Sequence, residues 1–144
     1  MKRFAPLVLF LAALVFGPGP AYATIDDALS FALEAADPYV KDNFTVREDY
    51  WGGDLPVKST KAIVHQLFKG NEYWFFLGTE LEKATLKVDI FDRKGTKINV
   101  ETKIVDNAAA VRVLAPATGT YIVVFSLTTK EQEQIPWALA YGYR

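Results

Sequence analysis

The sequence predicts a mainly β protein, an antiparallel β-sandwich with one amphipathic helix at its N-terminal end. From Lys61 onward, short segments rich in β-branched and aromatic residues alternate with turn residues about every ten positions, as in sandwich proteins. Before them, residues 25–36 place apolar side chains at helical spacing. The apolar run 121–127 follows the turn residues Pro116 and Gly119, which predicts a central strand covered on both faces.

The N-terminus predicts an export signal. Basic residues 2–3 precede the uncharged apolar segment 4–16, and alternating glycine and proline at 17–20 would end any helix. Ala21-Tyr22-Ala23 then matches the small-x-small cleavage pattern. The apolar segment is shorter than the roughly 20 residues that a membrane-spanning helix needs. We therefore expect residues 1–23 to be a signal peptide, cleaved near Ala23, and the protein to be periplasmic or secreted.

Composition limits the classes of function. The chain has 144 residues, no cysteine, and a net charge of −1 at pH 7. The absence of cysteine excludes disulfides, thiol catalysis and cysteine metal sites. The sequence shows no concentrated cluster of basic residues of the kind that nucleic-acid-binding proteins use. We expect a monomer with no membrane span in its mature chain, divided into a helical arm (24–43) and a sandwich domain (44–144).

The helix has a recognisable start and an apolar stripe. Thr24 is placed to cap it, and acidic residues occupy its first turn. Asp37-Pro38 should end it at residue 36, and Pro38 also suits the start of a further short turn through residues 39–42. The stripe consists of Ile25, Ala28, Leu29, Ala32, Leu33 and Ala36. An isolated helix of this length is marginal in water, so we expect the stripe, including Leu29 and Leu33, to be buried against a sheet.

The strands follow from alternation between apolar and polar residues. The predicted strands are 44–47, 62–68, 72–78, 85–91, 97–104, 109–114, 120–127 and 137–143. Residues 49–54 are predicted to be a loop. In strand 72–78, Tyr73, Phe75 and Leu77 should face the core. Trp74 and Phe76 then point outward, so this strand or strand 137–143 offers the outer face that the helix covers.

Three of these segments resemble one bacterial family. Gly70-Asn71-Glu72-Tyr73-Trp74-Phe75-Phe76, the hairpin 86–95 and the late Gly119-Thr120-Tyr121 strand are similar to the pattern of the pre-peptidase C-terminal domain. The similarity covers about residues 64–143. It implies a jelly-roll-like sandwich that accompanies a secreted enzyme and serves binding or maturation.

Residues suited to catalysis are few. His65 is the only histidine, and on its predicted strand it shares a face with Ile63 and Leu67. None of the serines after residue 23 lies in a nucleophile elbow of the G-x-S-x-G type. One histidine and no cysteine also argue against a zinc site. We therefore expect no enzyme activity and no catalytic residue, with a small secreted hydrolase as the less favoured alternative.

Oxygen ligands and aromatic rings leave two further possibilities. Asp89 and Asp92 with loop carbonyls suit calcium, but a solvent-facing strand position for Asp89 and a turn at Asp92 are the favoured explanation. No other cofactor is expected. Tyr50 and Trp51, flanked by Asp49 and Asp54, place large rings in a predicted surface loop, where binding residues are common.

The function expected from the sequence is that of an exported, non-enzymatic binding or accessory module for a protein or carbohydrate partner. The candidate ligand-binding residues are Asp49, Tyr50, Trp51 and Asp54. The alternative is a carrier that holds a small apolar ligand between the helix and the sheet.

The signal-peptide assignment makes a direct prediction. The exported protein should begin at Thr24, because Ala23 is the last residue of the small-x-small pattern. N-terminal sequencing of protein recovered from the periplasm or medium checks this. Recovery of an intact chain from the membrane fraction would refute it.

Overall fold

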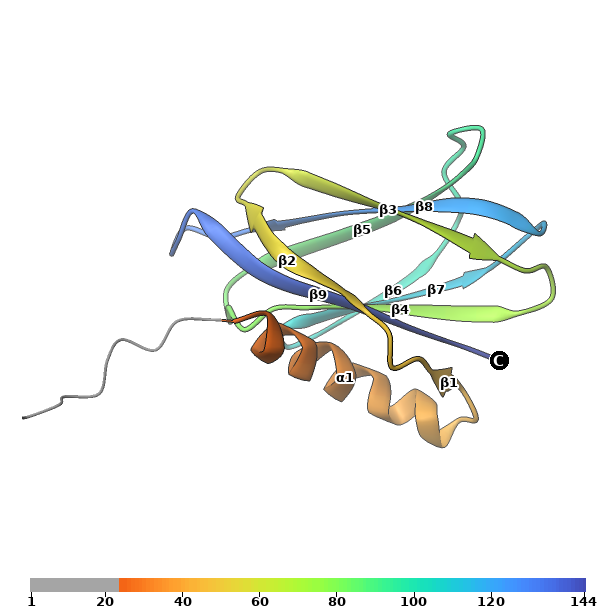
Figure 1. Cartoon of the computed structure of the whole chain (residues 1–144), viewed down its shortest axis with the longest axis horizontal. Coiled ribbons are helices and arrows are strands. Elements are labelled where there is room, and N and C mark those ends of the chain that lie inside the picture. The colour runs from red at the N-terminus through yellow and green to blue at the C-terminus, as the bar shows by residue number, and fades with distance from the viewer. Residues whose placement is uncertain (1–23) are drawn as a thin grey trace, which may run out of the picture.

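The computed structural model of the chain describes residues 24–144, so the predicted signal peptide lies outside the described residues. Figure 1 shows two layers of strands with a helix beneath them. The elements of this part of the chain are α1 (Ile25–Lys41), β1 (Thr45–Val46), β2 (Trp51–Pro56), β3 (Thr60–Leu67), β4 (Glu72–Gly78), β5 (Thr85–Asp92), β6 (Glu101–Val105), β7 (Ala108–Leu114), β8 (Gly119–Thr128) and β9 (Gln134–Tyr143).

The strands form two antiparallel sheets, which confirms the predicted sandwich with one helix. The larger sheet has the order β1-β9-β4-β7-β6, and β2 also pairs with β9. The smaller sheet has the order β3-β8-β5. β1 and β2 pair with different parts of β9, at Thr45–Val46 and at Trp51–Pro56. Residues 47–50 between them therefore leave the ladder at one edge of the larger sheet.

The main core lies between the sheets. In β4, Tyr73, Phe75 and Leu77 belong to it, as their alternation predicts. Trp74 and Phe76 point to the opposite face and form a second cluster with alanines of α1. The helix thus covers the outer face of β4 and β9, and both faces of these two strands are buried.

The helix meets the sheet through very small residues. A Cβ atom on Gly78 would lie 2.3 Å from the Ala28 carbonyl oxygen and 2.6 Å from the Ala32 backbone nitrogen. Ala28, Ala32 and Ala36 are buried in this contact, whereas Leu33 is 41% exposed. The prediction that Leu33 is buried was wrong, because so close an approach uses the alanines and leaves the longer side chain at the side of the helix.

The helix also runs five residues farther than predicted, to Lys41 instead of residue 36, with Pro38 inside it. Proline removes one helical N–H donor, which normally favours a helix end. Here the last turn is held by tertiary packing. The Tyr39 ring lies 4.2 Å from the Trp74 ring, and the Tyr39 carbonyl accepts the N–H of Phe44 at 3.0 Å.

Three strand predictions also need correction. Residues 49–54 are not all loop, because β2 begins at Trp51 and its backbone pairs with β9. Segment 97–104 is divided: Lys97 forms a bridge with Phe91 in the smaller sheet, and only Glu101–Val105 pairs with β7 in the larger one. β8 is central in its sheet but fully buried on one face only, because nothing described covers the outside of the smaller sheet.

A charged cluster holds the C-terminus beside the end of the helix. Glu72 pairs with Arg112 and, at 3.0 Å, with Arg144. Burial acts to raise the pKa of Glu72, but the two guanidinium groups outweigh it and hold the pKa below its usual value. Arg144 also donates to the Asp42 carbonyl oxygen at 3.0 Å.

In the described part of the chain, the one helix is not long and apolar enough to cross a membrane.

The contact at Gly78 yields a stability prediction. Gly78→Ala should lower the free energy of unfolding by about 1–3 kcal/mol, because the added Cβ must displace the backbone of α1. The urea unfolding midpoint measures the change. Gly119→Ala is the matched control, since nothing lies within 4 Å of the added atom. The control should be neutral or slightly stabilising. Equal losses in both variants would contradict the close contact.

Candidate functional site: an aromatic cleft

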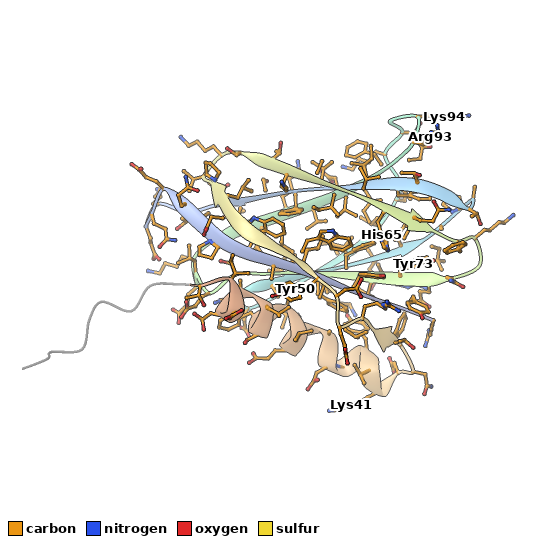
Figure 2. The ribbon with its side chains drawn as sticks, viewed as in Figure 1. Lys41, Tyr50, His65, Tyr73, Arg93 and Lys94 are labelled. Atoms are coloured by element: carbon orange, nitrogen blue, oxygen red, sulfur yellow. The ribbon has the colours of Figure 1, made fainter. Side chains whose placement is uncertain are left out.

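A cleft opens where the edge of the smaller sheet faces the end of β9. Its volume is about 390 Å³. It is lined by aromatic and polar side chains of β3, β4, β9 and the β3–β4 turn: His65, Gln66, Phe68, Asn71, Tyr73, Tyr141 and Tyr143. Figure 2 shows His65 and Tyr73 between the two layers.

A second hollow of about 530 Å³ is formed by the β5 turn and the loop before β8. Its lining residues are Gln66, Asp92, Arg93, Lys94 and residues 116–121. Arg93 and Lys94 are exposed at the turn (Figure 2), and Asp92 already accepts N–H groups of that turn. The smaller cleft is the better candidate, because several rings and one imidazole converge there.

Aromatic rings surround His65 at the base of the cleft. The imidazole is 4.5 Å from the Tyr141 ring, 5.3 Å from the Trp51 ring and 6.3 Å from the Phe75 ring, between ring centroids. All three contacts are edge-on, the geometry that ring quadrupoles favour. The side chain points inward because β3 alternates and Ile63 and Leu67 share its face.

This environment keeps the imidazole neutral. Burial lowers the pKa of His65; the Asp49 carboxylate opposes the effect, and Arg47 adds slightly to it. A pKa below the ordinary value of about 6.5 leaves the ring uncharged at pH 7. A neutral imidazole offers one hydrogen-bond donor and one acceptor. The cleft therefore presents a polar group to a ligand without presenting a charge.

Tyrosines supply the rest of the lining. The Tyr73 hydroxyl accepts the Phe68 N–H at 2.9 Å and the Asn71 side-chain amide at 3.2 Å, which fixes the turn below the cleft. The Tyr143 ring lies 6.4 Å from the Tyr73 ring and is half-buried. Burial raises the pKa of Tyr141, and the nearby Asp49 carboxylate adds to the effect, so its hydroxyl stays protonated.

An ion pair borders the cleft on the segment between β1 and β2. Arg47 Nε lies 3.0 Å from Asp49 Oδ1, and both side chains are exposed. The hydrogen bond from Arg47 holds the pKa of Asp49 below its usual value. The Arg47 backbone N–H donates to the Tyr141 carbonyl oxygen at 2.9 Å, which ties the segment to β9. Charge of both signs is thus available beside the aromatic rings.

The four residues singled out from the sequence do not form one group. Asp49 and Trp51 lie beside His65, and Trp51 packs partly buried against the core from β2 instead of standing in a loop. Tyr50 is 42% exposed and lies toward the helix, near Gly52 and Ile25. Asp54 is exposed farther along β2, where its backbone is opposite Pro136.

Sequence reasoning did not single out Tyr141 or Tyr143, and it placed Tyr73 in the core without assigning it to a site. One signal was present. Tyr141 and Tyr143 are two residues apart at the end of a predicted strand, so their side chains share a face. What the sequence did not reveal was the register, which places Tyr143 opposite Tyr73 across β9 and β4.

In the described part of the chain, the serine hydroxyls and carboxylates considered for catalysis or metal binding have other surroundings than His65. Ser126 lies on the outer face of β8, and the Ser30 hydroxyl donates to the Asp26 carbonyl on the helix. Within residues 24–144, no three side chains of metal-binding type are grouped. Asp89 pairs with Lys97 at 3.0 Å, and Asp92 accepts the N–H groups of Lys94 and Thr96. The calcium expectation stays untested.

Comparison with known proteins names no relative: no family model matches the chain, and no curated protein matches it significantly. The resemblance to the pre-peptidase C-terminal domain therefore remains a prediction. The sandwich fold is compatible with it.

The buried imidazole yields a pH prediction. The pKa of His65 should lie below 6.5, and Asp49→Asn should lower it further by removing a carboxylate that favours the charged form. Because the folded-state pKa is lower than the unfolded one, the contribution of His65 to stability is complete above about pH 6.5 and falls as the pH drops toward the folded pKa.

The pKa of His65 is measured by following the NMR chemical shifts of its imidazole against pH. The assignment is unambiguous because His65 is the only histidine in the sequence. Asp54→Asn is the control, since Asp54 is not among the groups that shift the His65 pKa. A pKa at or above 6.5 would contradict the buried, neutral ring.

Proposed function

We propose that the protein is an exported, non-enzymatic binding or accessory module, and that the aromatic cleft is its recognition site. The observation that carries the proposal is the convergence of His65, Tyr141 and Tyr143 on one cleft of about 390 Å³. That volume lies within the usual range for ligand sites, roughly 300–1,000 Å³. The partner class we favour is a carbohydrate or a protein segment that inserts one compact group.

The chemistry of the lining supports this partner class. Tyrosine combines a flat apolar face with a polar tip, which suits both a sugar ring and a protruding side chain. The neutral imidazole and the side-chain amides of Gln66 and Asn71 offer hydrogen bonds without the cost of burying a charge. The exposed Arg47–Asp49 pair can meet polar groups of a larger partner outside the cleft.

The carrier alternative has less support. A ligand between helix and sheet needs space there, but a single added carbon on Gly78 would already collide with the α1 backbone. Ala28, Ala32 and Ala36 are buried in this contact, and Trp74 and Phe76 pack in the same cluster. The hydrolase alternative requires a nucleophile beside His65, and the groups packed on the imidazole are the rings of Trp51, Phe75 and Tyr141.

A matched pair of aromatic variants tests the proposal. Oligosaccharide arrays and peptide libraries identify a probe, and titration calorimetry then measures its affinity. Tyr143→Ala should weaken binding at least about tenfold, equivalent to about 1.4 kcal/mol, because it removes a half-buried wall of the cleft. Tyr50→Ala is the control, since it removes an exposed ring that lies toward the helix and outside the cleft.

The opposite pattern, loss with Tyr50→Ala and none with Tyr143→Ala, would move the site to the helix side of β2. Trp51→Ala is less informative, because its ring also packs against the core and its loss should reduce stability as well as binding.

A further inference from the structure

Two carboxyl groups and one backbone nitrogen meet at the N-terminal end of α1. Thr24 and Asp27 form a capping box: the Asp27 N–H donates to Thr24 Oγ1 at 3.1 Å, and Asp27 Oδ2 accepts the Thr24 N–H at 3.2 Å and its hydroxyl at 2.6 Å. The third member is Glu80, which follows Thr79 after β4.

Glu80 is held in place by its backbone. Its carbonyl oxygen accepts the Asn107 side-chain amide at 3.0 Å, and the Asn107 carbonyl accepts the Thr79 N–H at 3.0 Å. Its side chain is half-buried, and its carboxyl oxygen Oε2 is shielded from solvent and accepts no hydrogen bond from an N–H or hydroxyl group of the described residues. An unpaired buried oxygen of a carboxyl group is costly and calls for a donor.

The electrostatics of this cluster are unfavourable while Thr24 carries an amide nitrogen. Burial raises the pKa of Glu80, and the neighbouring Asp27 raises it further, through its charge and through a hydrogen bond between the two carboxyl groups; the Thr24 N–H opposes these effects. The ion pairs formed within residues 24–144 involve other carboxylates. Within residues 24–144, these two acidic groups therefore share the Thr24 amide N–H and have no basic partner.

The sequence predicts cleavage at the bond that ends at this nitrogen. Hydrolysis of the Ala23–Thr24 peptide bond by the exporting cell's signal peptidase consumes one water molecule. It leaves a carboxylate on Ala23 and an ammonium group on Thr24. The amide with one N–H thus becomes a cation with three, without moving the helix.

We propose that removal of the signal peptide creates an α-ammonium group on Thr24 that binds the carboxylates of Asp27 and Glu80, so that processing supplies the missing cation of the folded protein. One N–H keeps the contact with Asp27, and the others are available to Glu80. The ammonium also joins the cap of α1 to the β4–β5 segment, on the edge of the contact made by Gly78. Export and full stability are then coupled in one chemical step.

The coupling has a defined pH window. An ammonium that gains two carboxylate partners has a pKa above the ordinary 7.7–8.0 of an α-amino group. Its folded-state pKa is raised, so its stabilising contribution is complete below about pH 7.7 and is lost as the pH rises through the folded value. The contribution also falls at acid pH, when Glu80 becomes protonated.

The test measures the pKa of the α-amino group in the exported, processed protein. The rate of acylation of the N-terminal amine is followed against pH by mass spectrometry of the N-terminal peptide, which also identifies the first residue. The same titration in concentrated urea gives the unfolded reference. We expect the folded value to exceed the unfolded one by about one pH unit, which makes acylation near pH 7 about tenfold slower.

Glu80→Gln is the decisive variant, because it removes one carboxylate and leaves the capping box intact. In this variant the pKa of the α-amino group should fall most of the way back to its unfolded value. Glu82→Gln and Asp26→Asn, which alter exposed acids close by, should leave that pKa unchanged. Equal amine pKa values in folded and unfolded protein would overturn the proposal. So would an unchanged pKa in Glu80→Gln, or a first residue other than Thr24.

Discussion

The rest of the structure depends on the contact between the alanine face of α1 and Gly78. Backbone meets backbone there, since even a Cβ on Gly78 would lie 2.3 Å from the Ala28 carbonyl oxygen. This contact lets Trp74 and Phe76 of β4 be buried on the outside of the sandwich, against the helix. Without the helix, these two rings would face water on a sheet whose other face is already filled by the main core.

The same contact positions the candidate site at a distance. β4 and β9 are buried on both faces, so their backbones are held firmly, and Tyr73, Tyr141 and Tyr143 are carried by these strands. The cleft lies near the gap in the pairing at the edge of the larger sheet, since β1 and β2 pair with separate parts of β9. Segment 47–50 bridges this gap and carries the Arg47–Asp49 pair beside the cleft. A strand buried on both faces on one side, and on the other a short segment held to β9 by the Arg47 N–H, suit a preformed recognition site.

Much of the fold could be predicted from the sequence, because period-two alternation and the helical stripe both report burial. The inward set Tyr73, Phe75 and Leu77 and the outward Trp74 and Phe76 were predicted correctly from alternation alone. Errors arose where tertiary contacts decide. Packing of Tyr39 on Trp74 carries the helix past Pro38, and a helix that approaches through alanines leaves Leu33 exposed. The cleft was missed for a related reason: it depends on the β4–β9 register and on His65 facing β9 across the sandwich, and neither is encoded in local sequence.

The measurement that tests this account most directly is native-state hydrogen exchange of residues in α1 and in the strands beneath it. If the helix is part of the fold, the amides of Ala32 and Ala36 should exchange only through the same global opening as those of Phe76 and Ala140, with the same opening free energy and the same dependence on denaturant. Exchange of the helix amides through a separate opening of much lower free energy, while β4 and β9 keep their protection, would contradict it. The helix would then be a loosely attached arm.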